Sequence, residues 1–279
     1  MKLDRIAIFE QQWIDPVRED QELTTFGTYT QFSRSFDGSS RGSYQIYLPP
    51  DYAEEPERRF PVLYWLHGGF AHSREGLPVV ARIDRAIRSG ALPPVIVVLP
   101  QSLPVGWYVD SRDGIRPVEQ SVANCLVQHV DTTYRTVAHR DARFLEGFSM
   151  GGYGALHLGL KYPKLFGRIS AIAPSILRDM AQEPEERIAN TFFGDRKYYD
   201  AVGPWTLALG NAPEVRRTCR IRVLSGTRDD RLAPTLRDFS AHLTSLAVPH
   251  EFHEVDGVGH EFDDIIGGLG ETYFTFWRD

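Results

Sequence analysis

The chain has 279 residues, of which 42% are hydrophobic, 12% aromatic and 24% charged, so it can bury the core of a globular domain. Its formal net charge of -6 and its pI near 5.9 argue against a general nucleic-acid or anionic-membrane binder, because such surfaces need a basic excess. No stretch approaches the length of a membrane-spanning helix, and the first residues lack the uninterrupted apolar run of a signal peptide.

The first fifty residues have the pattern of antiparallel strands. We expect these strands over Leu3 to Phe9, Leu23 to Phe36 and Ser43 to Leu48. The elements expected further on are, in chain order, a strand at 59–66, a helix at 79–89, a strand at 95–99, a helix at 118–134, a strand at 142–146, a helix at 152–162, a strand at 220–224, a helix at 232–246 and a strand at 249–255. This alternation predicts a single α/β domain over residues 1–279, with a mostly parallel, doubly wound sheet and N-terminal antiparallel strands.

The segment 181–213 has the least regular pattern of the chain. In an α/β fold of this kind, a segment between a late strand and the catalytic acid usually lies over the active site. We expect a short cap or a substrate-shaping insertion there, with a peripheral helix pair as the alternative.

The pentapeptide at 147–151, Gly-Phe-Ser-Met-Gly, is typical of a nucleophile elbow. A strand-like segment precedes it and a helical pattern follows it, so Ser149 should stand at a sharp turn with its hydroxyl exposed above the sheet. Gly147 and Gly151 occupy positions where the turn brings backbone against backbone and a Cβ would clash. We predict that Ser149 is a catalytic nucleophile.

A nucleophilic serine needs a base, and the base needs an acid that orients it. Asp229 follows the strand at 220–224, and His260 lies in the loop after the strand at 249–255, which gives the order Ser, Asp, His expected for an α/β-hydrolase. Asp230 is the alternative acid, although it could instead cap the helix that follows. Of the other histidines, His157, His250 and His253 are interpreted as packed or surface residues.

The oxyanion hole of such a site requires two amide donors. We expect one from Met150, directly after the nucleophile, and the second from the glycine-rich loop that follows the strand at 59–66. Gly69 is the first candidate for the second amide and Phe70 the next. His67 would brace this loop.

Four stretches of the chain resemble the esterase D-like family of α/β-hydrolases: Tyr44 to Tyr52, Leu66 to Gly69, Gly106 to Ser111 and Gly147 to Leu156. The family includes feruloyl and acetylxylan esterases, S-formylglutathione hydrolases and mycolyltransferases. The resemblance implies an α/β-hydrolase fold, a triad of Ser149, Asp229 and His260, and no metal or organic cofactor. It also suggests that Trp107 and Tyr108 lie near the acyl pocket, with core packing as the alternative reading of both rings. The His-Gly-Gly-Phe loop departs from the form expected in S-formylglutathione hydrolases.

The sequence therefore predicts a serine esterase that hydrolyses a small-molecule carboxylic ester through an acyl-enzyme intermediate. An acyltransferase with the same triad and an alcohol or sugar acceptor is the alternative, followed by a peptidase and by a non-catalytic binding protein on the same fold. Cys125 and Cys219 are interpreted as two reduced, buried thiols. Together with the lack of an export signal, they predict a cytoplasmic location, and we expect no nucleic-acid or membrane partner. The acyl group, the alcohol and the oligomeric state are left open.

Overall fold

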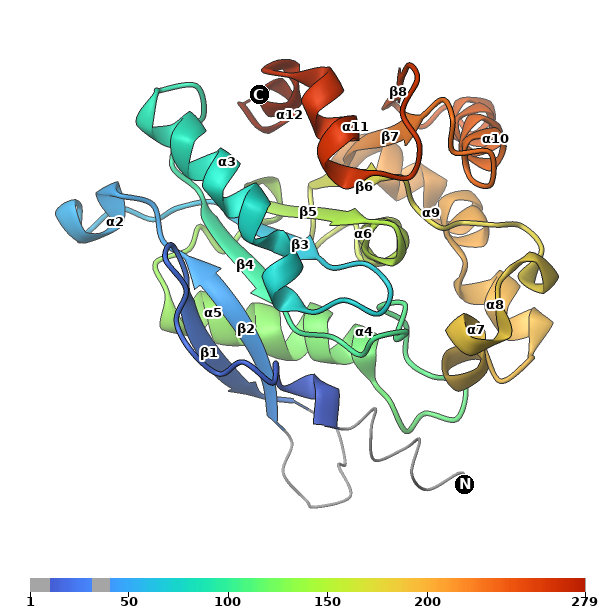
Figure 1. Cartoon of the computed structure of the whole chain (residues 1–279), viewed down its shortest axis with the longest axis horizontal. Coiled ribbons are helices and arrows are strands. Elements are labelled where there is room, and N and C mark those ends of the chain that lie inside the picture. The colour runs from blue at the N-terminus through green and yellow to red at the C-terminus, as the bar shows by residue number, and fades with distance from the viewer. Residues whose placement is uncertain (1–10, 32–40, 279) are drawn as a thin grey trace.

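A computed structural model describes residues 11–31 and 41–278. Within them, eight strands form one sheet in the order β1-β2-β4-β3-β5-β6-β7-β8 (Figure 1). β1 and β2 pair antiparallel, as do β2 and β4, and all the other neighbours are parallel. The strands are β1 (Thr25–Thr30), β2 (Arg41–Tyr47), β3 (Val62–Leu66), β4 (Ile96–Pro100), β5 (Arg143–Phe148), β6 (Arg168–Ile172), β7 (Arg220–Gly226) and β8 (His250–Val255).

Helices connect the strands and cover both faces of the sheet (Figure 1). They are α2 (Asp51–Glu54), α3 (Leu77–Arg88), α4 (Val118–Gln120), α5 (Val127–Thr133), α6 (Met150–Lys161), α7 (Glu185–Phe192), α8 (Arg196–Val202), α9 (Pro204–Thr218), α10 (Ala233–Ser245), α11 (Phe262–Leu269) and α12 (Thr272–Arg278). A π-helical stretch, Ser121–Leu126, joins α4 to α5 in one run.

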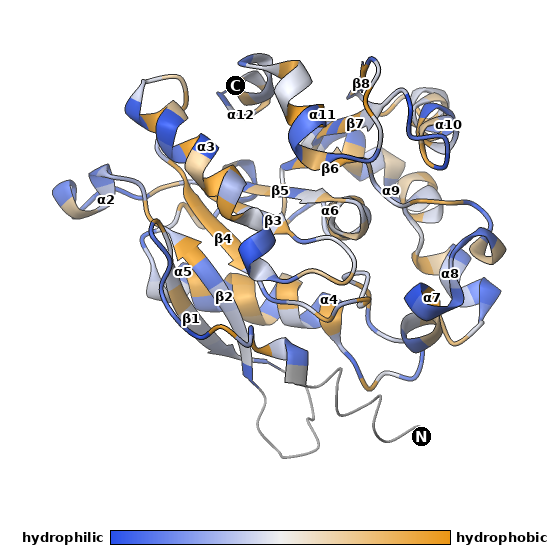
Figure 2. Ribbon diagram, in the orientation of Figure 1, coloured by the Kyte–Doolittle hydropathy of each residue, from blue (hydrophilic) through white to orange (hydrophobic). Residues whose placement is uncertain are grey.

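The central strands are apolar on both faces, because helices cover the sheet from both sides. All five residues of β3 are buried, and alternate side chains enter different layers. Tyr64 and Leu66 belong to the core shared with α5 and α6, whereas Leu63 and Trp65 pack with α3 and α12. Figure 2 shows the same arrangement, with hydrophobic central strands and hydrophilic residues along the outer surfaces of the helices.

The structure confirms the predicted fold class: a mostly parallel sheet between helices, with antiparallel strands at its N-terminal edge. The strand expected over Leu3 to Phe9 lies outside the described residues, and so does most of the second half of the strand expected over Leu23 to Phe36. Two differences stand out. The sequence did not predict β6, and the segment 181–213 is largely helical, with α7, α8 and the start of α9.

The topology gathers the functional loops at one edge of the sheet. The parallel strands β3, β5, β7 and β8 run in the same direction, so the loops that follow them emerge together at their carboxyl ends. These loops carry Gly69, Ser149, Asp229 and His260. Within the described ranges, no helix is long and apolar enough to cross a membrane.

The two cysteines are both free thiols. Cys219 is buried at the start of β7, as predicted, whereas Cys125 is only partly buried in the π-helical stretch. Among the residues that the structure describes, no group of three or more His, Cys, Asp or Glu side chains is arranged to hold a metal ion.

Candidate active site

Ser149 stands at the turn between β5 and α6, at the N-cap position of the helix. Its φ of 57° and ψ of -113° lie outside the ordinary regions for a residue with a side chain, which is the strain expected of a nucleophile elbow. Close packing requires the two flanking glycines. A Cβ on Gly151 would lie 1.9 Å from the Leu66 carbonyl oxygen, and one on Gly147 would lie 2.4 Å from the Gly151 backbone.

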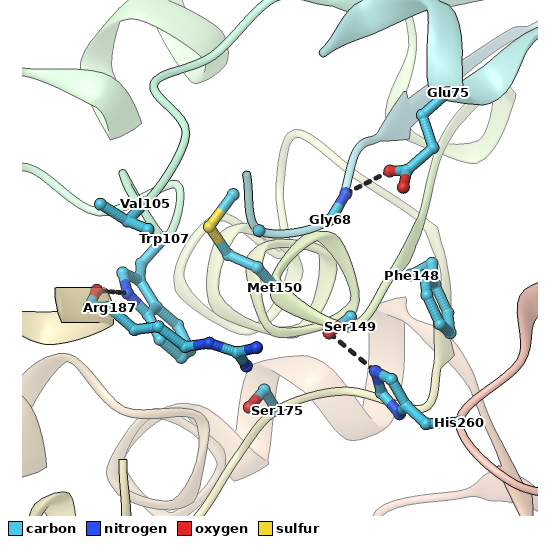
Figure 3. Close-up of a pocket in the computed structure, with 11 residues that line it drawn as sticks. Gly68, Glu75, Val105, Trp107, Phe148, Ser149, Met150, Ser175, Arg187 and His260 are labelled. Atoms are coloured by element: carbon cyan, nitrogen blue, oxygen red, sulfur yellow. Dashed lines mark hydrogen bonds between the residues drawn. The ribbon is translucent and has the colours of Figure 1, made fainter. Parts of the chain in front are cut away.

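The predicted triad residues form a continuous hydrogen-bonded chain. His260 Nε2 lies 2.9 Å from Ser149 Oγ, and His260 Nδ1 lies 2.7 Å from Asp229 Oδ2. Figure 3 shows the imidazole turned toward the serine hydroxyl. The Phe148 ring packs at 4.8 Å from the imidazole, centroid to centroid, and restricts the orientation of His260.

The two neighbouring aspartates lie in different environments. Asp229 is buried and contacts His260, whereas Asp230 is exposed. Burial alone would raise the pKa of Asp229, but the hydrogen bond and the charge interaction with His260 outweigh it, so the pKa lies below its ordinary value. The N-cap residue of α10 is Leu232 and makes no side-chain capping hydrogen bond, so the capping role considered for Asp230 is not seen. Asp229 Oδ1 accepts a hydrogen bond of 3.1 Å from the Leu232 N–H.

Gly69 and Met150, the two residues expected to supply the oxyanion amides, line the same pocket as Ser149. The Met150 N–H is at the first position of α6, where a helix leaves its N–H groups without internal partners. A Cβ built on Gly69 would lie 3.9 Å from Met150 Cβ, so the two residues are neighbours. The Phe70 N–H donates to the Pro104 carbonyl at 2.7 Å, whereas the Gly69 N–H makes no hydrogen bond within residues 11–31 and 41–278. The geometry thus favours Gly69 over Phe70.

His67 and Glu75 hold the loop that carries Gly69. The Ser102 N–H donates to His67 Nε2 at 3.1 Å, so His67 Nδ1 carries the proton and donates to the Gly68 carbonyl at 2.8 Å. Complete burial lowers the pKa of His67 to about 4 and keeps the ring neutral. The Gly68 N–H donates to Glu75 Oε2 at 2.6 Å, and burial raises the pKa of Glu75. The sequence indicated the bracing role of His67 but not that of Glu75.

The other histidines make their hydrogen bonds away from Ser149. His157 is fully buried on α6, 2.7 Å from Glu119 and 2.8 Å from the Val202 carbonyl. His250 contacts the Ser240 hydroxyl at 2.8 Å, and His253 is an exposed residue beside Glu251. These placements agree with their interpretation as packed or surface residues.

A pocket of about 180 Å³ opens at Ser149 (Figure 3). Trp107 lies in its wall, and its indole N–H donates to the Arg187 carbonyl at 2.6 Å. Tyr108 does not line the pocket. It is completely buried, packs where a Cβ on Gly154 would lie, and donates to the His67 carbonyl at 3.3 Å. The expectation that Tyr108 contacts substrate is therefore corrected: the core-packing alternative applies, and Tyr108 supports the backbone of His67, next to the loop that carries Gly69.

Three polar or charged pocket residues were not predicted from the sequence: Glu75, Ser175 and Arg187. Ser175 follows β6, and its hydroxyl lies 3.1 Å from Glu183 Oε1 and 3.0 Å from a guanidinium nitrogen of Arg231. Arg187 comes from α7, inside the segment expected to form a cap or an insertion. No local pattern marks these residues, because each reaches the pocket only through the tertiary fold.

The sheet and the strand–serine–helix turn define an α/β-hydrolase, and the comparison of folds agrees. A solved ferulic acid esterase superposes with a TM-score of 0.76 at 21% identity, covering 91% of this chain and 97% of that chain. The chain belongs to the Esterase family, because residues 38–278 match the family described as "Putative esterase".

Two curated relatives illustrate the range of the family. Esterase Rv1288 of Mycobacterium tuberculosis is 32% identical over 259 residues, covering 84% of this chain and 55% of the relative. The chain therefore spans about half the length of this relative. An acetyl esterase of Caldicellulosiruptor saccharolyticus is 25% identical over 236 residues, covering 77% of this chain and 85% of the relative.

Proposed function

We propose that this protein is a serine esterase that hydrolyses a small-molecule carboxylic ester through an acyl-enzyme intermediate. The observation that carries the proposal is the chain of contacts from Ser149 Oγ to His260 Nε2 and from His260 Nδ1 to Asp229 Oδ2, at 2.9 and 2.7 Å. This is the geometry of a nucleophile, its general base and the acid that orients the base. The family and the relatives named esterase and acetyl esterase support the same reaction class.

In the first half of the proposed reaction, Ser149 Oγ attacks the ester carbonyl carbon while His260 Nε2 takes the hydroxyl proton. Asp229, kept ionised by its lowered pKa, fixes the imidazole tautomer and stabilises the imidazolium. The carbonyl oxygen becomes negative and is bound by the amides of Gly69 and Met150. His260 then gives the proton to the departing alcohol, which leaves the acyl group on Ser149.

In the second half, His260 takes a proton from water, and the resulting hydroxide attacks the acyl carbon. The carboxylic acid leaves, and Ser149 regains its proton. The position of Ser149 at the N-terminus of α6 helps both steps, because the positive end of the helix dipole lies beside the developing oxyanion.

We also propose that the segment 181–213 shapes the substrate pocket. Arg187 of α7 lines the pocket with Ser149, and the Arg187 backbone carbonyl fixes the Trp107 ring in its wall. Both contacts support the interpretation of this segment as a substrate-shaping insertion rather than as a peripheral helix pair.

The first prediction tests the nucleophile. Ser149→Ala should lower kcat for 4-nitrophenyl acetate by about 10⁴-fold or more, because the variant cannot form the acyl-enzyme. It should also abolish labelling by a fluorophosphonate probe. Ser175→Ala is the matched control, since Ser175 lines the same pocket but contacts Glu183 and Arg231 instead of the imidazole, and it should keep the label. A correctly folded Ser149→Ala enzyme with unchanged turnover would contradict the proposal.

A further inference from the structure

Arg187 brings an unpaired positive charge into the pocket beside Ser149. Its side chain is half-buried, and Figure 3 shows the guanidinium extending from α7 toward the centre of the pocket, near Ser149 and Ser175. Among residues 11–31 and 41–278 this guanidinium donates no hydrogen bond and makes no ion pair. The guanidinium carbon lies 6.0 Å from the centroid of the exposed Phe70 ring.

The nearby carboxylates are already engaged. Glu183 lies on the same segment and its charge interacts with that of Arg187, but it forms no hydrogen bond or ion pair with Arg187, and its two oxygens contact the Ser175 hydroxyl at 3.1 Å and Arg231 at 3.3 Å. Glu75 also lines the pocket, yet it binds the Gly68 N–H and stands on the opposite side of Ser149 from Arg187 (Figure 3). A half-buried guanidinium with five donors and no carboxylate hydrogen-bonded to it is well suited to binding an anionic group of a ligand.

The geometry of the proposed reaction tells which part of the ester faces Arg187. The tetrahedral carbon carries four groups: Ser149 Oγ, the oxyanion, the leaving oxygen and the acyl chain. The oxyanion points to the Gly69 and Met150 amides, and the leaving oxygen must face His260 Nε2 to receive its proton. Arg187 and Trp107 lie on the side of Ser149 away from His260 (Figure 3). The acyl chain is therefore directed toward Arg187.

We propose that Arg187 selects esters whose acyl chain ends in a carboxylate, that is, half-esters of short dicarboxylic acids. This inference rests on the proposed esterase function and names its substrate class. The planar guanidinium can bind a carboxylate through two parallel hydrogen bonds. The pocket volume of about 180 Å³ lies below the range of about 300–1,000 Å³ found for drug-sized ligands, which favours a short acyl chain. The net reaction consumes one water and yields the alcohol, the dicarboxylate and one proton.

The test compares each anionic substrate with a neutral one of the same shape. Monobenzyl malonate, succinate and glutarate are paired with the benzyl esters of the corresponding half-amides, in which a carboxamide replaces the carboxylate. Released benzyl alcohol is measured by liquid chromatography. For at least one chain length we expect kcat/KM of the anionic ester to exceed that of its neutral partner by about tenfold or more. One charge-assisted hydrogen-bonded contact away from water is strong enough to give a preference of this size.

The variants assign this preference to one side chain. Arg187→Met should reduce the ratio of anionic to neutral kcat/KM to about one, and Arg187→Lys should keep part of it. The Trp107 hydrogen bond goes to the Arg187 backbone carbonyl, so these substitutions leave it in place. Arg178→Met is the matched control: Arg178 is exposed, stacks on Trp205 at 3.9 Å and does not line this pocket, so its variant should keep the wild-type ratio.

The possible results distinguish a failure of the proposed role of Arg187 from a failure of the proposed esterase function. A wild-type enzyme that hydrolyses the neutral esters without any anionic preference overturns the substrate class and leaves the esterase function standing. An anionic preference that persists in Arg187→Met overturns the assignment to Arg187. If wild-type protein hydrolyses none of the esters and takes no fluorophosphonate label, the proposed function fails, and the inference fails with it.

Discussion

At the scale of single residues, burial distinguishes the two adjacent aspartates, of which only one is positioned to orient the histidine. Asp229 and Asp230 are chemically identical, but only Asp229 lies 2.7 Å from His260. The pKa of Asp229 is held below its usual value by the contact with His260. Asp230 is exposed. An exposed carboxylate is screened by water and has little influence on a neighbouring imidazole.

The second prediction follows from this difference. Asp229→Asn should lower kcat for 4-nitrophenyl acetate by about 10³- to 10⁴-fold, because the amide leaves His260 in the wrong tautomer and cannot stabilise its charged form. Asp230→Asn, the matched control one position away, should stay within about threefold of wild type. Initial rates at pH 7.5 measure both. The opposite ranking would place the acid at Asp230.

At the scale of elements, the active site depends on how closely α6 approaches β3. The helix begins directly after Ser149, and Gly151 in its first turn lies against the Leu66 carbonyl at the end of β3. The approach is possible only without a side chain at that position. The same contact brings the Met150 amide toward the loop that carries Gly69.

The third prediction is that Gly151→Ala destabilises the fold although alanine is the better helix former. The new Cβ would lie 1.9 Å from a backbone oxygen, so α6 or β3 must shift, and we expect the free energy of unfolding to fall by about 3 kcal/mol. Gly210→Ala in α9 is the matched control. A Cβ there meets nothing within 4 Å, and the change should stabilise by about 0.5–1 kcal/mol. Urea unfolding measures both, and equal effects would contradict the packing argument.

The sequence predicted the elements with clear hydrophobic patterns and missed those without them. β3 and β4 are continuous apolar runs, and their positions were predicted to within a few residues. β6 was missed because its five residues include Arg168 and Ser170, which interrupt the apolar run. Helices α7 and α8 and the start of α9 lie in the segment predicted to be least regular, since Gly203 and Pro204 at the junction of α8 and α9 obscure the helical pattern. Their stability comes from packing on the rest of the fold.

At the scale of the whole molecule, the pocket joins residues that no local pattern connects. The meeting of Ser149, Asp229, His260 and the loop of Gly69 could be predicted, because each follows a strand and the carboxyl ends of parallel strands meet at one edge. Glu75 and Arg187 come from helical segments on either side of this edge, and their placement depends on tertiary packing alone. The sequence therefore predicted which residues meet beside Ser149, whereas it did not indicate the charged side chains of the pocket wall.

The same tertiary packing makes stability depend on pH through His67, which the core surrounds completely. Its pKa is about 4 in the folded protein and about 6.5 in an unfolded chain, so between these values the unfolded state binds more protons. Stability should therefore fall as the pH falls through this window. The contribution of this one group amounts to about 2 kcal/mol at pH 5 relative to pH 7 or above.

The last prediction isolates this contribution with His67→Gln. Glutamine has a donor and an acceptor to offer the Gly68 carbonyl and the Ser102 N–H, but it does not titrate. The variant should be less stable than wild type at pH 7.5, because its shape differs, and it should lose about 2 kcal/mol less stability on acidification to pH 5. Urea unfolding at pH 5 and pH 7.5 gives the change in the free energy of unfolding for each protein. Subtracting one change from the other removes the contribution of all groups that titrate alike in both proteins. Parallel losses in the two proteins would show that His67 does not titrate upon unfolding, and the acid sensitivity would then belong to other groups of the core.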